Sequence, residues 1–380
     1  MRWKKWKPSQ TVKKMSKTHY IIPIFVPDLG CPHRCVFCSQ KRITGMAGAP
    51  SGKKITDTIE QYLRTIPDKT GIRKEVAFYG GSFTAVDISL QIELLSPAYR
   101  FLSAGKIDGI RVSTRPDALS EEKMALLSTY GVDTVELGVQ SMDDVVLYQS
   151  GRGHTSRDVL RAAALVRTWG MKLGLQVMVG LPGDTEEKDI STATDLRAMR
   201  PDLVRIYPCL VLRETPMADM FRNGEYVPLT LEDAVERCKK MLLIFASAGI
   251  NVIRIGLQPS EQINLAGSVL AGPYHPAFRE LVESALACDQ LDILLSERAG
   301  INAADTVEVA VNERDISAVR GHNGRNVKFL RHKYGIRELI TFADSQLGRG
   351  AIRLVTIDGI DYRYTMSRTD LAAKYETRVH

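Results

Sequence analysis

Short runs rich in β-branched and aromatic residues alternate with longer stretches of helical periodicity from His19 onward. Runs of the first kind are typical of strands, and the longer amphipathic stretches predict helices that cover a sheet. Regular alternation of the two indicates successive βα units around a parallel sheet. The predicted strands are Tyr20–Val26, Glu75–Tyr79, Gly109–Ser113, Thr134–Val139, Leu173–Val179 and Leu203–Leu210.

The segments between these strands have the spacing of helices that bury one face. Most begin at Ser, Thr or Asp, whose side chains accept hydrogen bonds from the first free backbone N–H groups of a helix. The predicted helices are Ile55–Thr65, Leu90–Leu102, Glu121–Tyr130, Ser156–Trp169 and Glu186–Met199.

The second half of the chain continues this pattern and then departs from it. A helix is predicted over Leu231–Ala248, a strand-like run follows over Asn251–Leu257, and the core is expected to end near residues 258–261. Ala277–Leu295 has the periodicity of one long helix that leads to a last unit of about eighty residues. The predicted division is a basic N-terminal arm (1–18), an α/β core (19–258), a helical connector (259–300) and a small α+β unit (301–380).

The composition is that of an ordinary soluble globular protein, with 44% hydrophobic and 25% charged residues. No run of eighteen apolar residues occurs, so we expect no membrane span and no membrane partner. The chain shows no signal peptide and no disulfide framework, so we expect a reducing compartment and a cytoplasmic protein.

The excess of basic side chains is confined to the N-terminal arm. The formal net charge is +7, and residues 1–17 hold seven Arg and Lys and no acid, which leaves 44 basic and 44 acidic side chains elsewhere. Trp3 and Trp6 stand among these bases, a combination that suits phosphate neutralisation and stacking on unpaired bases. The arm is therefore a candidate RNA contact; a frayed, solvated terminus and a membrane-surface segment are the alternatives.

Three cysteines stand close together in the run Cys31-Pro32-His33-Arg34-Cys35-Val36-Phe37-Cys38. Three thiolates can hold three irons of a [4Fe–4S] cubane, whereas an ordinary ferredoxin supplies four, so one iron stays open for another ligand. Structural zinc with His33 or His19 as the fourth ligand is the alternative, because zinc takes mixed Cys and His sets at short spacings. The run therefore predicts a metal centre.

The spacing of these cysteines, with Phe37 before the last, closely resembles the radical S-adenosylmethionine (SAM) enzymes. In that family the open iron chelates the amino and carboxylate groups of SAM, and an electron from the cluster cleaves a sulfur–carbon bond to give a 5′-deoxyadenosyl radical. The resemblance implies a partial (β/α)6 barrel whose active residues lie at the C-terminal ends of the strands. Cys209, Cys238 and Cys288 are scattered along the sequence, which counts against subfamilies that carry an auxiliary cluster.

The same resemblance implies SAM contacts at the ends of the following strands. Gly80 and Gly81 resemble the segment whose backbone holds the amino end of SAM, since glycine allows close approach to a ligand. Ser113 aligns with a polar side chain directed at SAM, and a plain strand-ending turn before Pro116 is the alternative. Phe37 is expected to pack near the adenine.

Gln140 and Arg152 have the spacing found in oxygen-independent coproporphyrinogen dehydrogenases and in the Elongator catalytic subunit. A guanidinium can bind the SAM carboxylate through two hydrogen bonds, and an amide can bind ribose hydroxyls. Gln176 stands where the coproporphyrinogen enzymes have an acidic residue, which leaves its ribose contact open. The expected SAM contacts are Phe37, Gly80, Gly81, Ser113, Gln140, Arg152 and Gln176.

Two further segments, Arg205–Val211 and Ala271–Phe278, also resemble the Elongator catalytic subunit. Tyr207, Tyr274 and His275 within them could line the substrate end or be core residues with satisfied hydrogen bonds. The Elongator subunit continues into an acetyltransferase domain, for which this chain has no room, so its acetyl-dependent reaction is not carried over. An acyl-donor partner, if one exists, stays unknown.

The last unit has the predicted order of a KH domain, in which a G-x-x-G loop between two helices clamps single-stranded RNA. Basic side chains from Arg320 to Arg337 surround this loop and supply the electrostatic footprint of such a site, although a solvated helix face gives the same pattern. The predicted elements are a strand Thr306–Val311, helices Asp315–Val319 and Arg325–Tyr334, and strands Arg337–Phe342 and Ile352–Ile357. The expected RNA contacts are Gly321, His322, Asn323, Gly324, Arg325 and Lys328.

These observations together predict a radical SAM enzyme of the Elongator-like group that acts on RNA, tRNA above all. Cys31, Cys35 and Cys38 hold a [4Fe–4S] cluster in this interpretation, SAM is the second cofactor, and an external donor such as flavodoxin or ferredoxin supplies electrons. A radical SAM enzyme acting on a small molecule such as a tetrapyrrole is one alternative. An RNA-binding protein with a structural or sensing cluster is the other.

Overall fold

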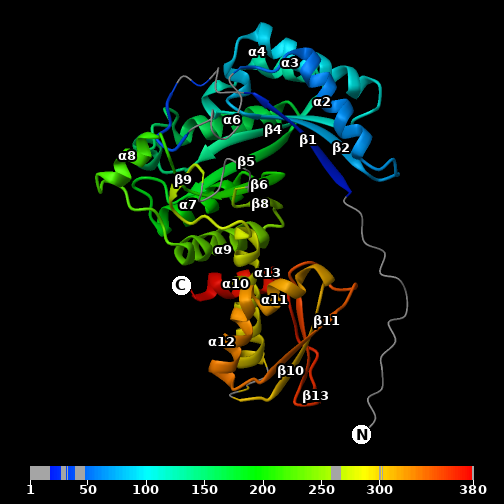
Figure 1. Ribbon diagram of the computed structural model, residues 1–380, viewed down its shortest axis with the longest axis vertical. Coiled ribbons are helices and arrows are strands. Elements are labelled where there is room, and N and C mark those ends of the chain that lie inside the picture. The colour runs from blue at the N-terminus through cyan, green and yellow to red at the C-terminus, as the bar shows by residue number, and fades with distance from the viewer. Residues whose placement is uncertain are drawn as a thin grey trace.

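The computed structural model describes residues 18–26, 31, 33–38, 48–257, 267–298, 301 and 303–378. The predicted basic arm, apart from Thr18, and the expected end of the core at residues 258–261 lie outside the described residues. Figure 1 shows two bodies stacked along the long axis, with the N-terminal α/β body above and a smaller C-terminal unit below.

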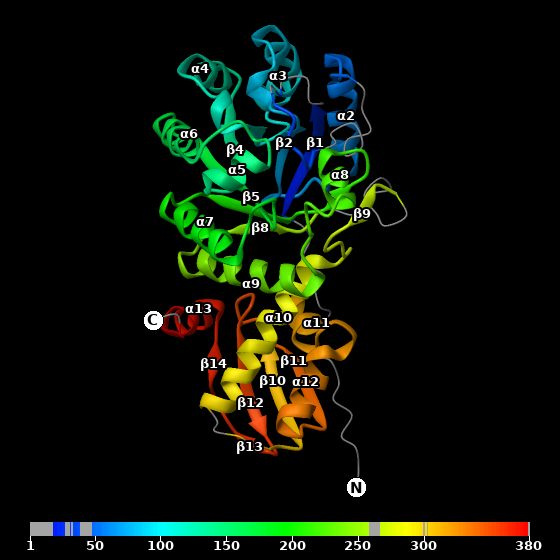
Figure 2. The same ribbon diagram turned by 90° about the vertical axis from the view of Figure 1, so that its left-hand side faces the viewer.

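A parallel sheet of seven strands forms the centre of the larger body. Its strand order is β1-β2-β3-β4-β5-β6-β8, and every neighbouring pair is parallel. The sheet curls into a half-barrel with helices around its outside (Figure 2). The strands are β1 His19–Val26, β2 Arg73–Gly80, β3 Gly109–Thr114, β4 Val132–Gln140, β5 Lys172–Val179, β6 Leu203–Pro208 and β8 Val252–Ile255.

The predicted helices all form, and most start at the expected capping residue. The side chains of Ser51, Ser120, Thr155, Thr185 and Thr230 each accept a hydrogen bond from the first turn of the helix that follows. The helices on the outer face are α2 Gly52–Thr65, α3 Ile88–Ser103, α4 Glu121–Thr129, α6 Ser156–Thr168, α7 Glu186–Ala198 and α9 Leu231–Ser247.

The hydrophobic core lies between the outer face of the sheet and these helices. Successive side chains of a strand point to opposite faces, and in β1 the residues Ile22, Ile24 and Val26 are at most 4% exposed whereas Phe25 between them is 38% exposed. The opposite, inner face of the sheet lines the hollow of the half-barrel and carries the polar residues of the strands.

The structure differs from the sequence-based expectation in three ways. The strand-like run after α9 becomes a seventh parallel strand, β8, so the half-barrel has seven strands rather than six. The sixth strand ends at Pro208, two residues early, because the chain turns into β7 Val211–Leu212, which pairs with β9 Val269–Ala271. The short helices α5 Asp144–Gln149 and α8 Pro216–Arg222 were not predicted, since six or seven residues are too few to show periodicity.

The C-terminal unit has the predicted elements in the predicted order, followed by β13, β14 and α13, which were not predicted. Its central strand β10 pairs in parallel with β11 and antiparallel with β12, and short β13 and β14 extend the sheet on β12. The bounds are β10 Thr306–Val311, α11 Ile316–Arg320, α12 Arg325–Tyr334, β11 Glu338–Ala343, β12 Ile352–Ile357, β13 Ile360–Asp361, β14 Thr365–Met366 and α13 Arg368–Arg378.

Helix α10, Phe278–Ile293, joins the two bodies, and the chain continues from it into a short π-helix, Leu294–Arg298. Polar side chains fix it to the C-terminal unit: Asn326 Nδ2 donates to the carbonyl of Ser284 at 2.9 Å, and Gln290 Nε2 donates to that of Met366 at 3.0 Å. Toward the barrel, Asp289 pairs with Lys239 of α9 at 2.6 Å. None of the described helices is long and apolar enough to cross a bilayer.

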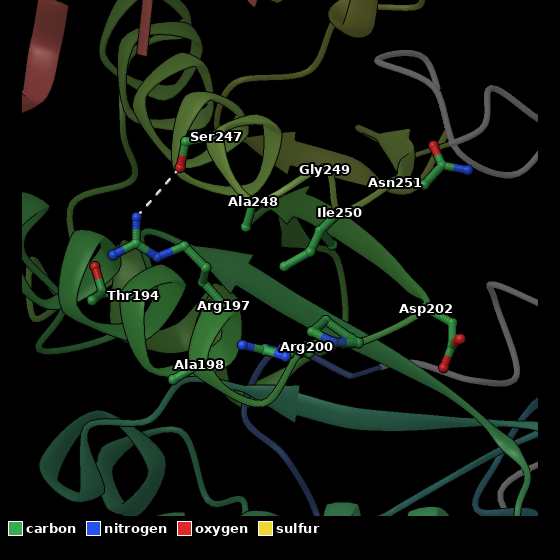
Figure 3. Close-up of a pocket in the computed structure, with 11 residues that line it drawn as sticks. Thr194, Arg197, Ala198, Arg200, Asp202, Ser247, Ala248, Gly249, Ile250 and Asn251 are labelled. Atoms are coloured by element: carbon green, nitrogen blue, oxygen red, sulfur yellow. Dashed lines mark hydrogen bonds between the residues drawn. The ribbon is translucent and has the colours of Figure 1, made fainter. Parts of the chain in front are cut away.

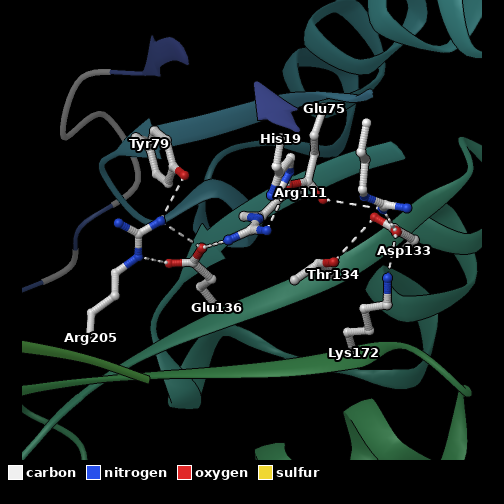
Figure 4. A network of polar contacts seen from close by, with 10 residues as sticks. His19, Glu75, Tyr79, Arg111, Asp133, Thr134, Glu136, Lys172 and Arg205 are labelled. Atoms are coloured by element: carbon white, nitrogen blue, oxygen red, sulfur yellow. Dashed lines mark hydrogen bonds and ion pairs between the residues drawn. The ribbon is translucent and has the colours of Figure 1, made fainter. Parts of the chain in front are cut away.

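A buried chain of alternating charges lies on the inner face of the sheet (Figure 4). Arg111 stands between two carboxylates, with Glu75 at 2.6 Å and Glu136 at 2.5 Å, and Arg205 approaches Glu136 at 2.7 Å. All four side chains are at most 9% exposed. Buried charges are tolerated only where they are paired and hydrogen-bonded. Here Glu75, Arg111 and Glu136 come from the adjacent strands β2, β3 and β4, and Arg205 of β6 reaches Glu136 across β5.

Replacing Arg111 with Met tests this network. The substitution leaves the carboxylates of Glu75 and Glu136 without their common partner, so the free energy of unfolding at pH 7 should fall by about 3–5 kcal/mol in urea titrations. The matched control is Arg161→Met, which removes an exposed pair with Asp158 and should change the free energy by less than about 0.5 kcal/mol.

The pH dependence of the same variant supplies an independent readout. Burial, the largest influence, favours a raised pKa for Glu75, but the hydrogen bond from His19 and the charge of Arg111 outweigh it and lower this pKa from 4.5 to about 2. The stability that depends on ionised Glu75 is thus present above pH 4.5 and is lost as the pH falls toward 2. In Arg111→Met the Glu75 carboxyl loses the charge of Arg111 and takes up a proton at a higher pH than in the wild type, so the deficit against the wild type should shrink between about pH 7 and pH 4. A deficit independent of pH would contradict a charge-based cause.

Candidate functional site

The cysteine run follows β1 at the edge of the sheet where the C-terminal ends of the parallel strands meet. Cys35 is 8% exposed, and Cys31 and Cys38 are half-buried. Residues 35–38 form a turn in which the N–H of Cys38 donates to the carbonyl of Cys35 at 3.1 Å. Because parallel strands place their carboxyl ends together, residues that follow β2 to β5 lie along the same edge.

Two backbone hydrogen bonds hold the cysteine loop from opposite sides. The N–H of Val36 donates to the carbonyl of Ser150 at 3.0 Å, and the carbonyl of Val36 accepts from the N–H of Met217 at 2.9 Å. Val36 and Phe37 also pack on a separate apolar cluster that includes Leu181. The unpredicted helices α5 and α8 therefore fix this loop, and the expected adenine neighbour Phe37 is half-buried beside them.

Two glycines let the chain after α5 run directly against the cysteine loop. Gly151 has φ +64°, and a Cβ atom placed on it would lie 3.0 Å from the carbonyl oxygen of Arg34. Gly153 has φ +72°, and a Cβ atom there would lie 2.3 Å from Cδ2 of His33. Any larger side chain would push the two segments apart, so we call Gly151–Gly153 the glycine strip.

Arg152 projects from the glycine strip onto Cys35. It is 7% exposed, its Nη1 lies 3.3 Å from Cys35 Sγ, and its Nη2 donates to the carbonyl of Gly138. A second buried arginine, Arg115, donates to the carbonyl of Arg152 and pairs with Asp117 at 2.9 Å. The sequence suggested Arg152 as a SAM contact; the structure places its guanidinium beside a thiol.

Cys31 is also influenced by Arg115 and Arg152. Burial is the main cause that raises the pKa of the Cys31 thiol, whereas a backbone hydrogen bond from Ser82 and the charges of Arg115 and Arg152 act to lower it. Thiolates are the form that binds metal, and cations and N–H donors stabilise them. The C-terminal ends of β1, β2, β3 and β4 thus converge on the thiols.

The other expected SAM contacts line the inner face close by. Gln176 of β5 is paired in register with Gly138 of β4, and a Cβ atom on Gly138 would lie 3.1 Å from Nε2 of Gln140. Ser113 of β3 is half-buried and is paired in register with Glu136, two residues before Gly138 in β4. Gly80 is paired in register with Val26 at the end of β1, and Gly81 donates its N–H to the carbonyl of Val26 at 2.7 Å.

Several buried polar atoms at this edge lack hydrogen-bond partners within the described part of the chain. Gln140 is 4% exposed and adopts φ +71°, a strained value for this residue. Buried polar groups without partners are rare in native structures, and a bound ligand, ion or water is a common reason for them. The atoms concerned are Gln140 Oε1, Arg152 Nε, Arg115 Nη1, His154 Nδ1 and Ser150 Oγ. The residues present therefore fit a charged, polar cofactor next to the thiols.

The zinc alternative fits the geometry less well. His19, one suggested fourth ligand, lies at the start of β1, where it is hydrogen-bonded to Glu75 at 3.1 Å, at the opposite end of the strand from Cys31. Among the described residues, no three His, Cys, Asp or Glu side chains converge as the ligands of a single metal ion. In a cubane each thiolate binds a different iron, so its ligands need not converge in this way.

The floor of the hollow carries two tyrosines that face the same space. Arg205 Nη2 donates to the Tyr79 hydroxyl at 2.9 Å, and Tyr207 on the same strand as Arg205 is half-buried. Burial first, and then the charge of Glu136, raise the pKa of Tyr79 to about 12, so it stays a neutral hydroxyl. Tyr207, for which the sequence left a place at the substrate end or in the core open, therefore lies half-buried on the inner face.

A separate open hollow of about 880 Å³ lies between the ends of α7 and α9, on the side where β6 and β8 begin (Figure 3). Its polar lining includes Thr194, Arg197, Arg200, Asp202, Ser247 and Asn251. It contains none of the expected site residues, so it has no part in the chemistry suggested by the cysteines.

The G-x-x-G loop of the C-terminal unit lies against the segment that follows β9. The rings of His322 and His275 meet edge to face with centroids 5.2 Å apart. Gly321, Asn323 and Gly324 all have positive φ, at 81°, 52° and 70°. The loop therefore touches His275, for which the sequence left a place at the substrate end or in the core open.

One face of α12 continues from this loop. Arg325, Lys328, Phe329 and His332 recur at helical spacing and are all exposed, with Phe329 39% exposed. Lys333, by contrast, is paired with Asp292 at 2.6 Å. The exposed positive charge near the loop thus comes from Arg325 and Lys328, the two basic residues expected to contact RNA, together with Arg320 and Arg331.

Sequence reasoning missed the glycine strip, Arg115 and the charge network. The signal for the strip was present, since Gly151 and Gly153 flank Arg152 directly. Charged residues within otherwise apolar strands, such as Glu75 and Arg111, were the signal for the network. Neither signal shows which partner it meets, because that depends on the register of neighbouring strands.

Family models match most of the described barrel. The model of the radical SAM superfamily matches residues 26–196, and that of the radical SAM C-terminal domain matches residues 201–287. Residues beyond 287, which include the G-x-x-G loop, lie outside both matches.

Individual relatives agree with these matches. A tRNA uridine(34) acetyltransferase of Methanocaldococcus jannaschii is 27% identical over 269 residues, which are 60% of this chain and 49% of that protein. An uncharacterised protein of the same organism is 31% identical over 225 residues, or 56% of this chain and 68% of that protein. The chain spans about half the length of the acetyltransferase relatives.

A solved structure shares the fold. Elp3 of Methanocaldococcus infernus, with an N-terminal deletion, superimposes with a TM-score of 0.57 at 23% identity, covering 72% of this chain and 64% of that one. The sequence motifs, the half-barrel and the family matches agree on fold class and cofactors. The chain belongs to the radical SAM superfamily, whose members bind a [4Fe–4S] cluster and S-adenosylmethionine.

Proposed function

We propose that this protein is a radical SAM enzyme that modifies tRNA. Cys31, Cys35 and Cys38 hold the cluster, which when bound supplies the electron that cleaves SAM reductively to a 5′-deoxyadenosyl radical. The single observation that supports this most is the group of unpartnered buried polar atoms around Gln140 and Arg152, directly beside Cys35. A site built for structure alone would satisfy these atoms internally.

The inner face supplies the binding groups for SAM. The carbonyls at Gly80 and Gly81 can accept from its ammonium group, and the free Nε of Arg152 can donate to its carboxylate. Ser113, Gln140 and Gln176 offer an alcohol and two amides to the ribose hydroxyls. Phe37 packs beside the adenine in this arrangement.

The walls of the hollow keep water away from the reactive centre. An alkyl radical abstracts hydrogen from almost any C–H group, so one target must be positioned and others excluded. The neutral hydroxyl of Tyr79, held by Arg205, and Tyr207 line the floor without adding free charge. They orient the part of the substrate that enters the hollow.

RNA is the proposed substrate class because of the C-terminal unit. Its G-x-x-G loop has the backbone geometry for close approach to phosphates, and α12 presents Arg325, Lys328 and an exposed Phe329 beside it. Cations next to an exposed aromatic ring suit a single strand, whose bases stack and whose phosphates need neutralising. The name of the acetyltransferase relatives supports tRNA, and flavodoxin or ferredoxin is the proposed electron donor.

Cys35→Ala tests the cluster assignment. Loss of one thiolate should abolish the iron–sulfur absorption of anaerobically purified protein and reduce dithionite-driven release of 5′-deoxyadenosine from SAM to background. Cys288→Ala, a half-buried thiol on α10 away from the site, should retain both. Wild-type protein that binds zinc alone would refute the proposal.

Gly153→Ala tests whether the glycine strip holds the cysteine loop. The new methyl group collides with His33, so iron content per chain after reconstitution should fall at least several-fold. Gly170→Ala is the matched control, since its φ of +67° gives similar strain while no atom lies within 4 Å. Equal iron contents in the two variants would contradict the role of the strip.

Gly324→Asp tests RNA binding by the loop. The added carboxylate repels phosphate, so affinity for a single-stranded RNA or tRNA, measured by fluorescence anisotropy, should fall about tenfold or more. Gly335→Asp is the matched control, because both glycines flank α12 with φ +70° and open space around them. If the two variants bind RNA equally well, the loop does not contact RNA.

A separate assay of the wild-type protein tests the substrate class. Cleavage of SAM that is stimulated by tetrapyrroles but not by RNA would favour a small-molecule substrate.

A further inference from the structure

Two buried arginines face the thiols, and they differ in how their charge is balanced. Arg115 is neutralised by Asp117, with two contacts of 2.9 and 3.0 Å. Arg152 forms no ion pair with any described carboxylate, and its contacts are a thiol and a backbone carbonyl. The positive charge of Arg152 is therefore directed at Cys35.

The orientation of Arg152 is fixed before any ligand binds. Its backbone N–H donates to the carbonyl of Leu147 at 3.0 Å, and its own carbonyl accepts from Arg115. The glycines on both sides hold the backbone against the cysteine loop. A guanidinium fixed in this way costs little further entropy when it acts on the sulfur.

Hydrogen bonds to the thiolate sulfurs and nearby charge are known determinants of iron–sulfur potentials. Reduction adds negative charge to a cluster, so a buried cation and an N–H donor at 3.3 Å from a ligand sulfur stabilise the reduced state more than the oxidised state. The effect is strong here because Arg152 is only 7% exposed and water screens it little.

We propose that Arg152 tunes the reduction potential of the cluster through Cys35, in addition to any contact with SAM. The positive side chain makes the cluster easier to reduce, so that the electron donor can reduce it before SAM is cleaved. This inference rests on the proposed function, since it requires that the three thiolates hold the cluster. Arg152 is thus a positioning residue for electron transfer that acts through a ligand.

The test is a redox titration of the reconstituted full-length protein without SAM, followed by electron paramagnetic resonance. Arg152→Gln should shift the midpoint potential to more negative values, with at least a tenfold lower ratio of reduced to oxidised cluster at the wild-type midpoint, or about 59 mV for one electron. Arg152→Lys keeps the charge but loses the planar fork, so its shift should be smaller and of the same sign. Arg157→Gln, which removes an exposed arginine of α6, should leave the potential unchanged.

Each outcome decides the inference. An Arg152→Gln protein with a wild-type midpoint and weaker SAM binding would overturn it, because Arg152 would then serve SAM alone. If Arg152→Gln retains no iron, Arg152→Met, which also removes the charge, decides: a wild-type midpoint overturns the inference and a negative shift supports it. A wild-type protein without a cluster would instead refute the proposed function and is recognised before any variant is compared.

Discussion

The contact between the glycine strip and the cysteine loop is the constraint on which the rest of the site depends. Gly151 and Gly153 can lie against Arg34 and His33 only because they lack a Cβ atom. That approach brings Ser150 to Val36 and Arg152 to Cys35. These contacts hold the described part of the cysteine loop, residues 33–38, at the edge of the half-barrel.

The polar residues of the inner face fall into two layers with opposite properties. In the lower layer Glu75, Arg111, Glu136 and Arg205 alternate in sign and pair with one another. These paired charges hold one another in place, and of the four side chains only Arg111, at its Nε, has a buried polar atom without a partner among the described residues. In the upper layer, next to Cys35, several buried donors and acceptors lack partners among the described residues. The contrast separates a structural floor from a binding edge within one sheet.

The C-terminal unit is packed on the barrel in a fixed orientation. Helix α10 makes buried polar contacts with residues on both sides, through Asp289 toward α9 and Ser284 toward α12. The edge-to-face contact of His275 and His322 brings the G-x-x-G loop to a segment matched by the radical SAM C-terminal model. The loop and the barrel are therefore in direct contact through these two rings.

The sequence by itself determined the order and type of the elements, because β-branched runs, amphipathic spacing and capping residues such as Thr155 and Thr185 are local signals. It also determined the cysteine motif and hence the family. Short helices such as α5 and α8 carry too few residues for such a signal, and they prove to hold the cysteine loop. Only the tertiary structure decided that Arg152 faces Cys35 and that Arg111 pairs with two carboxylates, because those contacts join residues 25 to 117 positions apart. Partners at such separations are set by strand register and chain crossing, which no local pattern in the sequence encodes.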